Sequence, residues 1–336
     1  MGERIGALSV ISGGLDSILA TRVMMDQGTV VTAIHFATPF FGSLPGRDGD
    51  AFCERMKEKF GITAISVDIT EKYIAMLSSP SYGYGKNFNP CVDCKILLLA
   101  AAREMMDDFN AKFIITGEVL GQRPMSQRRD AMRVIERDSG TSGILLRPLS
   151  AKLFKPTVPE EKEWVNRDEL FSFSGRSRKP QIELAARLGI TGYPAPAGGC
   201  CLTDPIQAVR IRKLYTMREH PDRREAKLIQ IGRPFLLGDG TILSVGRNEE
   251  ENETIEGLAL EGDLFFKLVD IPGPLGLLVG NSDQEMRRRA MAIVAYFSKA
   301  RDLSTVRVGM GKAPDSFETV WDVTPAGQNE IVQTRF

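Results

Sequence analysis

Short runs of apolar residues alternate with longer stretches of helical spacing in the first half of this chain. Continuous apolar runs predict buried strands at 5–11, 29–37, 62–69, 111–119 and 143–149. Apolar positions three and four residues apart predict helices at 17–28, 50–61 and 93–109. Since buried strands that alternate with helices are typical of parallel sheets, we expect an α/β fold with a doubly wound parallel sheet.

The pattern changes near residue 190. Residues 191–204 are rich in proline and glycine, and a basic segment follows up to residue 227. From Leu228 onward, short apolar runs return, with one helical stretch at 284–301. We therefore expect three segments: an α/β domain at 1–190, a linker and basic segment at 191–227, and a smaller α+β domain at 228–336.

Composition indicates an ordinary globular protein. The chain has 336 residues, of which 43% are hydrophobic and 26% charged. It contains no apolar run of membrane-spanning length and no recognisable signal peptide. The sequence therefore predicts a cytoplasmic protein without a membrane partner.

Charge is balanced overall but unevenly placed. The 43 basic and 43 acidic residues cancel, which gives no general sign of nucleic-acid binding. Arginine is nevertheless concentrated in residues 121–137, 174–180, 210–227 and 286–290. Solvated helix faces explain most such runs, but four of them in one chain leave a phosphate-contacting surface as a hypothesis.

The stretch "SGGLDS", residues 12–17, joins the first predicted strand to the first predicted helix. Backbone amides at a helix N-terminus lack intrahelical partners, and the helix dipole there is positive, which favours an anion. Glycines allow close approach to a phosphate, and Ser12 and Ser17 add hydroxyl groups. The stretch lacks the Walker A pattern, and the alternative is an ordinary strand–helix turn.

Five cysteines are present, and two of them form "CVDC", residues 91–94, just before a predicted helix. In a reducing compartment this spacing indicates metal or redox chemistry, and the helix N-terminus should lower the thiol pKa. Only two histidines are available, so a zinc site would be poorly supplied. A third thiol would be Cys200 or Cys201, and we favour Cys200 because it follows Gly198 and Gly199. Cys53 is expected to pack in a helix.

"SGGLDS" resembles the signature of the PP-loop ATP pyrophosphatases, which share the fold of the adenine nucleotide alpha hydrolases. These enzymes cleave ATP between the α and β phosphates and adenylate a substrate. The resemblance implies that ATP and Mg²⁺ are cofactors and that Asp16 lies beside the magnesium. It also implies that pyrophosphate is contacted by Ser12, Gly13, Gly14 and Ser17. Adenine would be contacted by His35 and Phe36, and the residues that face the nucleotide would be Gly117 and Glu118.

Three later stretches extend the resemblance. "NPCVDCK" at 89–95, "TGEVLGQRPMSQ" at 116–127 and "GGCCLTD" at 198–204 occur in the order seen in tRNA thiouridine synthases, both 2-thiouridylases and 4-thiouridine synthases. This resemblance implies an ATP-dependent sulfurtransferase that adenylates a tRNA nucleobase carbonyl and replaces its oxygen with sulfur. The sulfur donor would be sulfide or a persulfide carrier such as a cysteine desulfurase.

The family uses its cysteines in two ways. In one subset, a cysteine pair carries a persulfide and then forms a disulfide; in the other, C-x-x-C and one late cysteine hold a [4Fe-4S] cluster. This sequence is similar to the second subset. The resemblance therefore implies that Cys91, Cys94 and Cys200 are both catalytic residues and cluster ligands.

Residues 244–253, 262–274 and 286–301 resemble the NFACT-R RNA-binding domain of ribosome quality-control proteins. The match departs at 265–267, where Phe-Phe-Lys replaces a Trp-x-His-like segment, and at 272–275. RNA-phosphate contacts remain a hypothesis for Arg247 and for the arginines at 287–289. A structural or dimerising role is the alternative, which leaves a homodimer open. For the whole chain, the alternatives are adenylation of a small molecule for sulfur or ammonia transfer, and an RNA-binding adaptor with a nucleotide-sensing domain.

Overall fold

The computed structural model describes residues 4–42, 46–195, 200–238 and 240–336. The chain forms two compact units, Met1–Asp204 and Pro205–Phe336. The limits at residues 190 and 227 that the sequence suggested stay predictions. Among the described residues, no helix is both long and apolar enough to cross a membrane.

The first unit is built on a five-stranded sheet in the order β3-β2-β1-β4-β5, in which every neighbouring pair is parallel. Its strands are β1 (Gly6–Val10), β2 (Val30–Ala37), β3 (Ala64–Asp68), β4 (Ala111–Thr116) and β5 (Leu145–Leu146). From β1 the chain builds outward to β2 and β3, and it then returns to the other side for β4 and β5. This arrangement confirms the doubly wound sheet, and it puts the switch point, where such folds bind ligands, between the carboxyl ends of β1 and β4.

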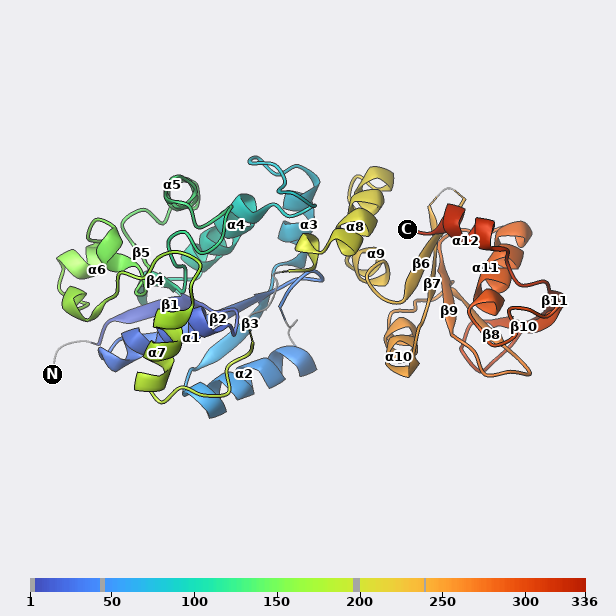
Figure 1. Cartoon of the computed structure of the whole chain (residues 1–336), viewed down its shortest axis with the longest axis horizontal. Coiled ribbons are helices and arrows are strands. Elements are labelled where there is room, and N and C mark those ends of the chain that lie inside the picture. The colour runs from blue at the N-terminus through green and yellow to red at the C-terminus, as the bar shows by residue number, and fades with distance from the viewer. Residues whose placement is uncertain (1–3, 43–45, 196–199, 239) are drawn as a thin grey trace. The chain divides into compact units, whose positions relative to one another are not determined.

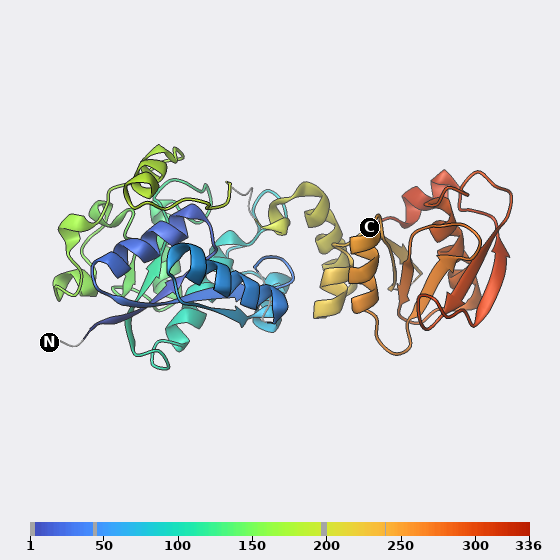
Figure 2. The same ribbon diagram turned by 90° about the horizontal axis from the view of Figure 1, so that it is seen from below.

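Helices cover both faces of this sheet (Figure 1; Figure 2 gives the perpendicular view). One face carries α1 (Leu15–Asp26), α2 (Arg47–Phe60) and α7 (Lys179–Arg187); the other carries α3 (Thr70–Ser78), α4 (Cys91–Glu104) and α5 (Arg129–Asp138). Helix α1 is buried over most of its surface because it lies between the sheet and α7, and Leu15, Ile18 and Met24 are fully buried in the core.

The predicted strand at 143–149 is wrong in length, since β5 contains two residues. Pro148 has no N–H to donate to a strand ladder, and the chain turns there into the 3₁₀ helix Ala151–Leu153. The Ser150 hydroxyl stabilises this turn by accepting a hydrogen bond from Leu120 N and donating one to the Phe173 carbonyl. Helices α3, α5, α7 and the short α6 (Val158–Glu161) were not expected from the sequence pattern.

The second unit contains a six-stranded antiparallel sheet in the order β11-β10-β8-β9-β7-β6. Its strands are β6 (Arg233–Leu237), β7 (Thr241–Val245), β8 (Leu264–Leu268), β9 (Gly276–Val279), β10 (Val306–Gly311) and β11 (Thr319–Val323). Helix α11 (Gln284–Tyr296) buries Ala290, Met291 and Val294 in a core that includes Leu243 and Phe266. This unit confirms the smaller α+β domain.

Four further helices belong to this unit: α8 (Pro205–Met217), α9 (Arg223–Leu228), α10 (Glu249–Gly257) and α12 (Gln328–Thr334). A second apolar cluster joins Leu228 at the end of α9 and Ile255 of α10 to Phe265 and Leu277 of the sheet. Strand β7 is buried along its whole length, with Leu243 and Val245 in the α11 core.

Candidate functional site

The loop between β1 and α1 has the backbone that an anion site needs. Gly13 has a φ of 77°, in the left-handed region, and a Cβ there would lie 2.8 Å from Cε2 of Phe52. Gly14 is the N-cap of α1, and within the described chain no side chain caps this helix start. The Ser17 hydroxyl instead donates to the Gly14 carbonyl over 2.8 Å and lies 3.4 Å from the Ser12 hydroxyl. The amides at the start of α1 therefore suit the phosphates of a nucleotide.

Asp16 lies in the first turn of α1. Its Oδ2 accepts a 2.7 Å hydrogen bond from Nε2 of Gln122, and Gln122 in turn accepts one from Gln181 over 3.2 Å. Its Oδ1 is buried and has no hydrogen-bond partner among the described residues. A buried carboxylate oxygen without a partner next to a phosphate-binding loop fits a hard cation such as Mg²⁺.

Gly117 directly follows β4 and lies against the backbone of the loop. A Cβ at this position would be 2.4 Å from the carbonyl carbon of Asp16 and 2.5 Å from N of Ser17. A Cβ atom does not approach a non-bonded backbone atom so closely, so only glycine permits the approach of β4 to α1. The switch point between β1 and β4 therefore depends on a glycine in each of the two strand-end loops.

We expect Gly117→Ala to push the loop away from β4. The loss of close packing should lower the free energy of unfolding by about 1–3 kcal/mol. It should also weaken the ATP binding that the resemblance implies, at least about tenfold, because Asp16 and the amides move together. Thermal unfolding and calorimetric ATP titration measure the two effects. Gly327→Ala is the matched control, since a Cβ there meets no atom within 4 Å. ATP affinity equal to that of the unaltered protein would contradict the prediction.

His35 and Phe36 lie near the end of β2 and are both 4% exposed. The His35 ring stacks on Phe52 with centroids 3.7 Å apart, and its Nδ1 lies 3.1 Å from the Ile11 carbonyl. Burial lowers the pKa of His35 despite the opposing hydrogen bond to Ile11. The imidazole is therefore neutral near pH 7, and its Nδ1–H donates to Ile11, which suits a positioning group better than a proton acceptor.

A cavity of about 310 Å³ opens beside these residues. Residues of the loop between β1 and α1, which we call the phosphate-type loop, line the cavity together with residues of β2 and α2. The full lining comprises Ser12, Gly13, His35, Gly42, Phe52, Arg55, Met56, Phe60, Gly192 and Pro194. The cavity is of a size to take part of a nucleotide, and it lies next to the α1 amides.

Two of the predicted site cysteines lie in the first turn of α4. Cys91 begins the helix, and the Cys94 amide donates to the Pro90 carbonyl. The Asn89 side chain donates to Sγ of Cys91 and to Sδ of Met125, each over 3.2 Å, and thus joins the 116–127 segment to the cysteine loop. Buried Asp93 holds the preceding loop by accepting from Ser81 N over 2.8 Å.

The third cysteine, Cys200, reaches the same place from a distant part of the chain. It precedes the 3₁₀ helix Cys201–Thr203, whose Thr203 carbonyl accepts a 2.6 Å hydrogen bond from Asn87. The charge of Cys91 raises the pKa of Cys200, in addition to the larger effect of burial. Gly198 and Gly199, on which the preference for Cys200 rested, lie outside the described residues.

Burial also determines the state of Cys94. It raises the pKa of this thiol to about 12; Lys95 and a hydrogen bond from Tyr73 oppose the shift, and Cys200 and Cys91 add to it. The expectation that a helix N-terminus would lower this pKa is therefore wrong for Cys94, because desolvation outweighs the helix dipole. Burial raises the pKa of Tyr73, which is 1% exposed, and the charges of Cys94, Cys200 and Cys91 raise it further. Of the three thiols, Cys94 also shares a hydrogen bond with the Tyr73 hydroxyl.

The donor chemistry of these thiols fits an iron–sulfur cluster or another soft metal. In the described part of the chain, however, no three or more His, Cys, Asp or Glu side chains are grouped so as to hold a metal ion. The charges of neighbouring thiols influence the pKa of Cys94 and of Cys200, but within the described residues the thiols are not arranged as a ready metal site. Their role as cluster ligands therefore stays a prediction.

Glu118 connects the loop to the cysteine helix. Its side chain is 2% exposed; Oε2 accepts a 3.0 Å hydrogen bond from Nε of Arg147, and Oε1 lies 3.6 Å from Nζ of Lys95. Burial by itself raises the pKa of Glu118, but the charges of Lys95 and Arg147 outweigh it, so the net shift is downward. Glu118 is therefore an ionised, buried link between Gly117, which touches Asp16, and Lys95, which follows Cys94.

Several of these residues were missed by sequence reasoning. Lys95 and Gln122 could have been proposed as site residues from the sequence, because each lies inside a stretch that carries the family resemblance. Nothing in the sequence pattern marked Tyr73 or Arg147 as site residues. Tyr73 lies in the unpredicted helix α3, and Arg147 directly follows β5.

Comparisons with known proteins agree with the two resemblances. Residues 2–153 match the family model described as thiamine biosynthesis protein (ThiI), and residues 232–335 match the one described as NFACT protein RNA binding domain. The chain thus joins a segment similar to ThiI to a segment similar to the NFACT domain, which confirms the two resemblances drawn from the motifs.

Individual relatives match one segment each. The Rqc2 homolog RqcH of Streptococcus suis is 34% identical over 114 residues, which are 33% of this chain and 20% of the relative. A probable tRNA sulfurtransferase of Lysinibacillus sphaericus is 28% identical over 158 residues, 44% of this chain and 35% of the relative. The matches therefore span a fifth and about a third of these relatives. A solved 4-thiouridine synthetase–RNA complex with bound ATP aligns with 55% of this chain and 51% of its own, at 18% identity and a TM-score of 0.35.

Proposed function

We propose that this chain is an ATP-dependent sulfurtransferase that adenylates a carbonyl group of a tRNA nucleobase and replaces its oxygen with sulfur. One observation carries the proposal. A chain of contacts connects the loop between β1 and α1, which suits phosphates, to the helix that carries two of three electrostatically interacting thiols. Gly117 packs on Asp16, Glu118 approaches Lys95, and Lys95 follows Cys94 in the helix that also begins with Cys91. A nucleotide site and a sulfur site in one unit suit a reaction that activates a carbonyl and then adds sulfur.

In the first step, the nucleobase oxygen attacks the α-phosphorus of ATP, and pyrophosphate leaves with the electron pair of the broken P–O bond. Ser12, Gly13, Gly14 and Ser17 would hold the pyrophosphate through the α1 amides and the two hydroxyls. The Oδ1 atom of Asp16 is suited to Mg²⁺, which would neutralise charge on the departing phosphates. His35 and Phe36 would position the adenosine.

In the second step, a sulfur nucleophile attacks the carbon that carries the adenylate, and AMP leaves with the C–O electron pair. Cys91, Cys94 and Cys200 would deliver that sulfur, taken from sulfide or from a persulfide carrier. A [4Fe-4S] cluster held by these three thiolates would provide an iron site at which sulfide can bind. In the alternative, a persulfide on one cysteine attacks the base, and a second cysteine then breaks the S–S bond. The sulfur stays on the base, and the resulting disulfide is reduced by an external thiol. Buried Tyr73 would position Cys94 through its hydroxyl group.

The C-terminal unit supports an RNA substrate, because residues 232–335 match an RNA-binding family model. We place the reaction in the cytoplasm, where tRNA and ATP are both present. A small-molecule acceptor is the second candidate, since the loop and the thiols alone would serve it equally well.

The proposal is tested first by nucleoside mass spectrometry of bulk tRNA from cells with and without this gene. We expect one thionucleoside to disappear and to return with the unaltered gene. In vitro, tRNA should stimulate the conversion of ATP to AMP and pyrophosphate. If the nucleoside profile is unchanged in a strain that lacks other tRNA thiolases, the proposal that tRNA is the substrate is overturned. Turnover of ATP that ignores tRNA would instead favour a small-molecule acceptor.

A further inference from the structure

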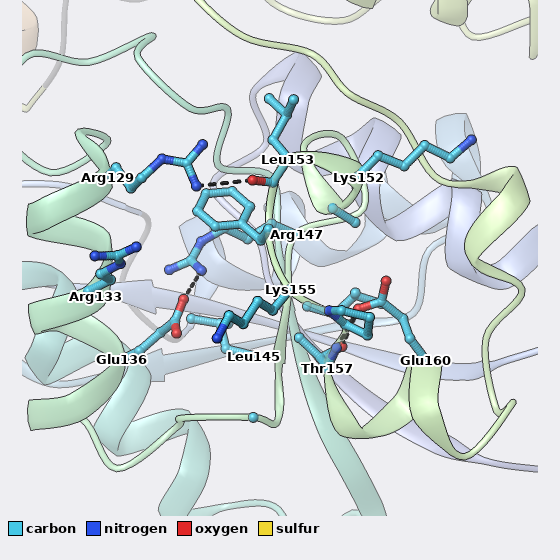
Figure 3. A pocket seen from close by; sticks show the side chains of 15 residues that line it. Arg129, Arg133, Glu136, Leu145, Arg147, Lys152, Leu153, Lys155, Thr157 and Glu160 are labelled. Carbon is cyan, nitrogen blue, oxygen red and sulfur yellow. Dashed lines mark hydrogen bonds and ion pairs between the residues drawn. The ribbon is translucent and has the colours of Figure 1, made fainter.

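A second cavity lies at the β5 edge of the first sheet, away from the loop after β1. Its volume is about 670 Å³, larger than that of the cavity beside the phosphate-type loop. Helix α5 forms one wall, and residues 151–160 form the other (Figure 3). None of the residues assigned to ATP or sulfur lines it.

The cavity carries surplus positive charge. Arg129 and Arg133 reach it from α5, and Lys155 reaches it from the opposite wall, whereas Lys152 points away (Figure 3). All three inward side chains belong to exposed residues, and within the described ranges none of them forms an ion pair. Neither acid of the lining pairs with Arg129, Arg133 or Lys155 among the described residues, because Glu136 pairs with Arg147 and Glu160 with Arg167.

Arg147 forms the base of this cavity and is incompletely satisfied. Its side chain is 3% exposed; Nε donates to Glu118 and Nη1 to Glu136. Its Nη2 is buried and has no hydrogen-bond partner in the part of the chain that the structure describes. A buried guanidinium nitrogen without an acceptor is costly, and it is explained where a ligand supplies the acceptor oxygen.

Aromatic packing holds the arginines in position. The guanidinium groups of Arg129 and Arg147 lie 5.0 and 5.6 Å from the centre of the Phe154 ring. Arg129 also donates to the Leu153 carbonyl over 3.0 Å. Stacked guanidinium groups lose little freedom when they bind, and their paired N–H groups match the oxygens of a phosphate.

We propose that this cavity binds a phosphate group of the RNA backbone, at a site separate from the ATP site. Two exposed arginines and a lysine over a buried arginine suit the phosphodiester of a long polyanion, which gains affinity from every cation it meets. The arginine-rich stretch at 121–137 supplies Arg129 and Arg133, which the ATP and sulfur chemistry does not use. This inference rests on the proposed function in that the RNA is the substrate of the sulfurtransferase.

The test uses the full chain with Arg133 and Lys155 both changed to alanine. Fluorescence anisotropy with labelled tRNA, over about 50 to 200 mM salt, should show affinity reduced roughly tenfold and a shallower salt dependence, by about one to two units of slope. Basal ATP cleavage without RNA should be unchanged, since neither residue approaches the loop. Arg128→Ala is the matched control: it lies beside Arg129 and is exposed, but it pairs with Asp130 and does not line the cavity.

Three outcomes would overturn the inference. The first is unchanged tRNA affinity and salt slope in the double variant. The second is an equal loss of tRNA affinity in Arg128→Ala, because tRNA would then be attracted by the overall positive charge of the basic stretch and not by this cavity. The third is loss of binding of inorganic phosphate with tRNA binding intact, which would make this a site for a free anion. Failure of the proposed function is distinguishable, because tRNA would then bind through this cavity without any thionucleoside being formed.

Discussion

Replacing Cys91, Cys94 or Cys200 by alanine is expected to abolish thionucleoside formation, with a loss of at least about 100-fold in each single variant. The three thiols come from one helix turn and one distant loop, and their charges act on one another and on Tyr73, so removal of any one breaks the set. Residues that act as a unit give single-variant losses nearly as large as the combined loss. Nucleoside mass spectrometry of tRNA after reaction with ATP and a sulfur donor measures the effect.

Cys53→Ala and Cys201→Ala are the matched controls. Cys53 packs at the edge of the apolar core of the first unit, and Cys201 adjoins Cys200 in sequence. Activity that survives Cys200→Ala and is lost in Cys201→Ala would reassign the third thiol. Iron analysis after anaerobic purification separates the two sulfur chemistries. About four irons per chain, lost in the Cys200 variant, would support the cluster, and full thiolation without iron would support a persulfide.

Glu118→Gln should lower the free energy of unfolding by roughly 3–5 kcal/mol. The substitution keeps the shape of the side chain but removes the charge that faces both Arg147 and Lys95. Arg147 is 3% exposed, and of the two carboxylates paired with it among the described residues, Glu118 and Glu136, only Glu136 would remain. Lys95 would also lose the charge of its buried partner. Urea unfolding followed by circular dichroism measures the change. A loss below about 1 kcal/mol, the range of exposed ion pairs, would contradict it.

Acidification provides a second test of the same residue. The pKa of Glu118 is lower in the folded protein than its ordinary value of 4.5, so its ion pairs stabilise the fold above that pH. This contribution is lost as the pH falls through the lowered folded-state pKa. The stability difference between the unaltered protein and Glu118→Gln should therefore shrink below pH 4.5. Glu104→Gln is the control: its carboxylate is 66% exposed and, among the described residues, pairs only with exposed Lys72, so we expect a small and nearly pH-independent effect.

Much of the architecture was predictable from local pattern. Four of the five parallel strands, the helices α1, α2 and α4 and the α+β character of the second unit follow from apolar spacing, which depends on neighbours a few residues apart. The anion-type loop was equally visible, because glycines between a strand and a helix require only local backbone geometry. The errors occurred where local signals compete, as at Pro148, which ends β5 after two residues.

By itself, the sequence determined the fold class, the two family resemblances and the residue types of the site. Only the tertiary structure decided which of those residues meet. It brought Cys200 to Cys91 and Cys94, placed Gly117 on the backbone of Asp16, and put Arg147 between Glu118 and the basic cavity. It also reversed the expected pKa shift of Cys94, because burial is a property of the packed chain. Contacts between distant segments depend on the path of the whole chain and on exclusion of water, and neither is encoded in the spacing of neighbouring residues.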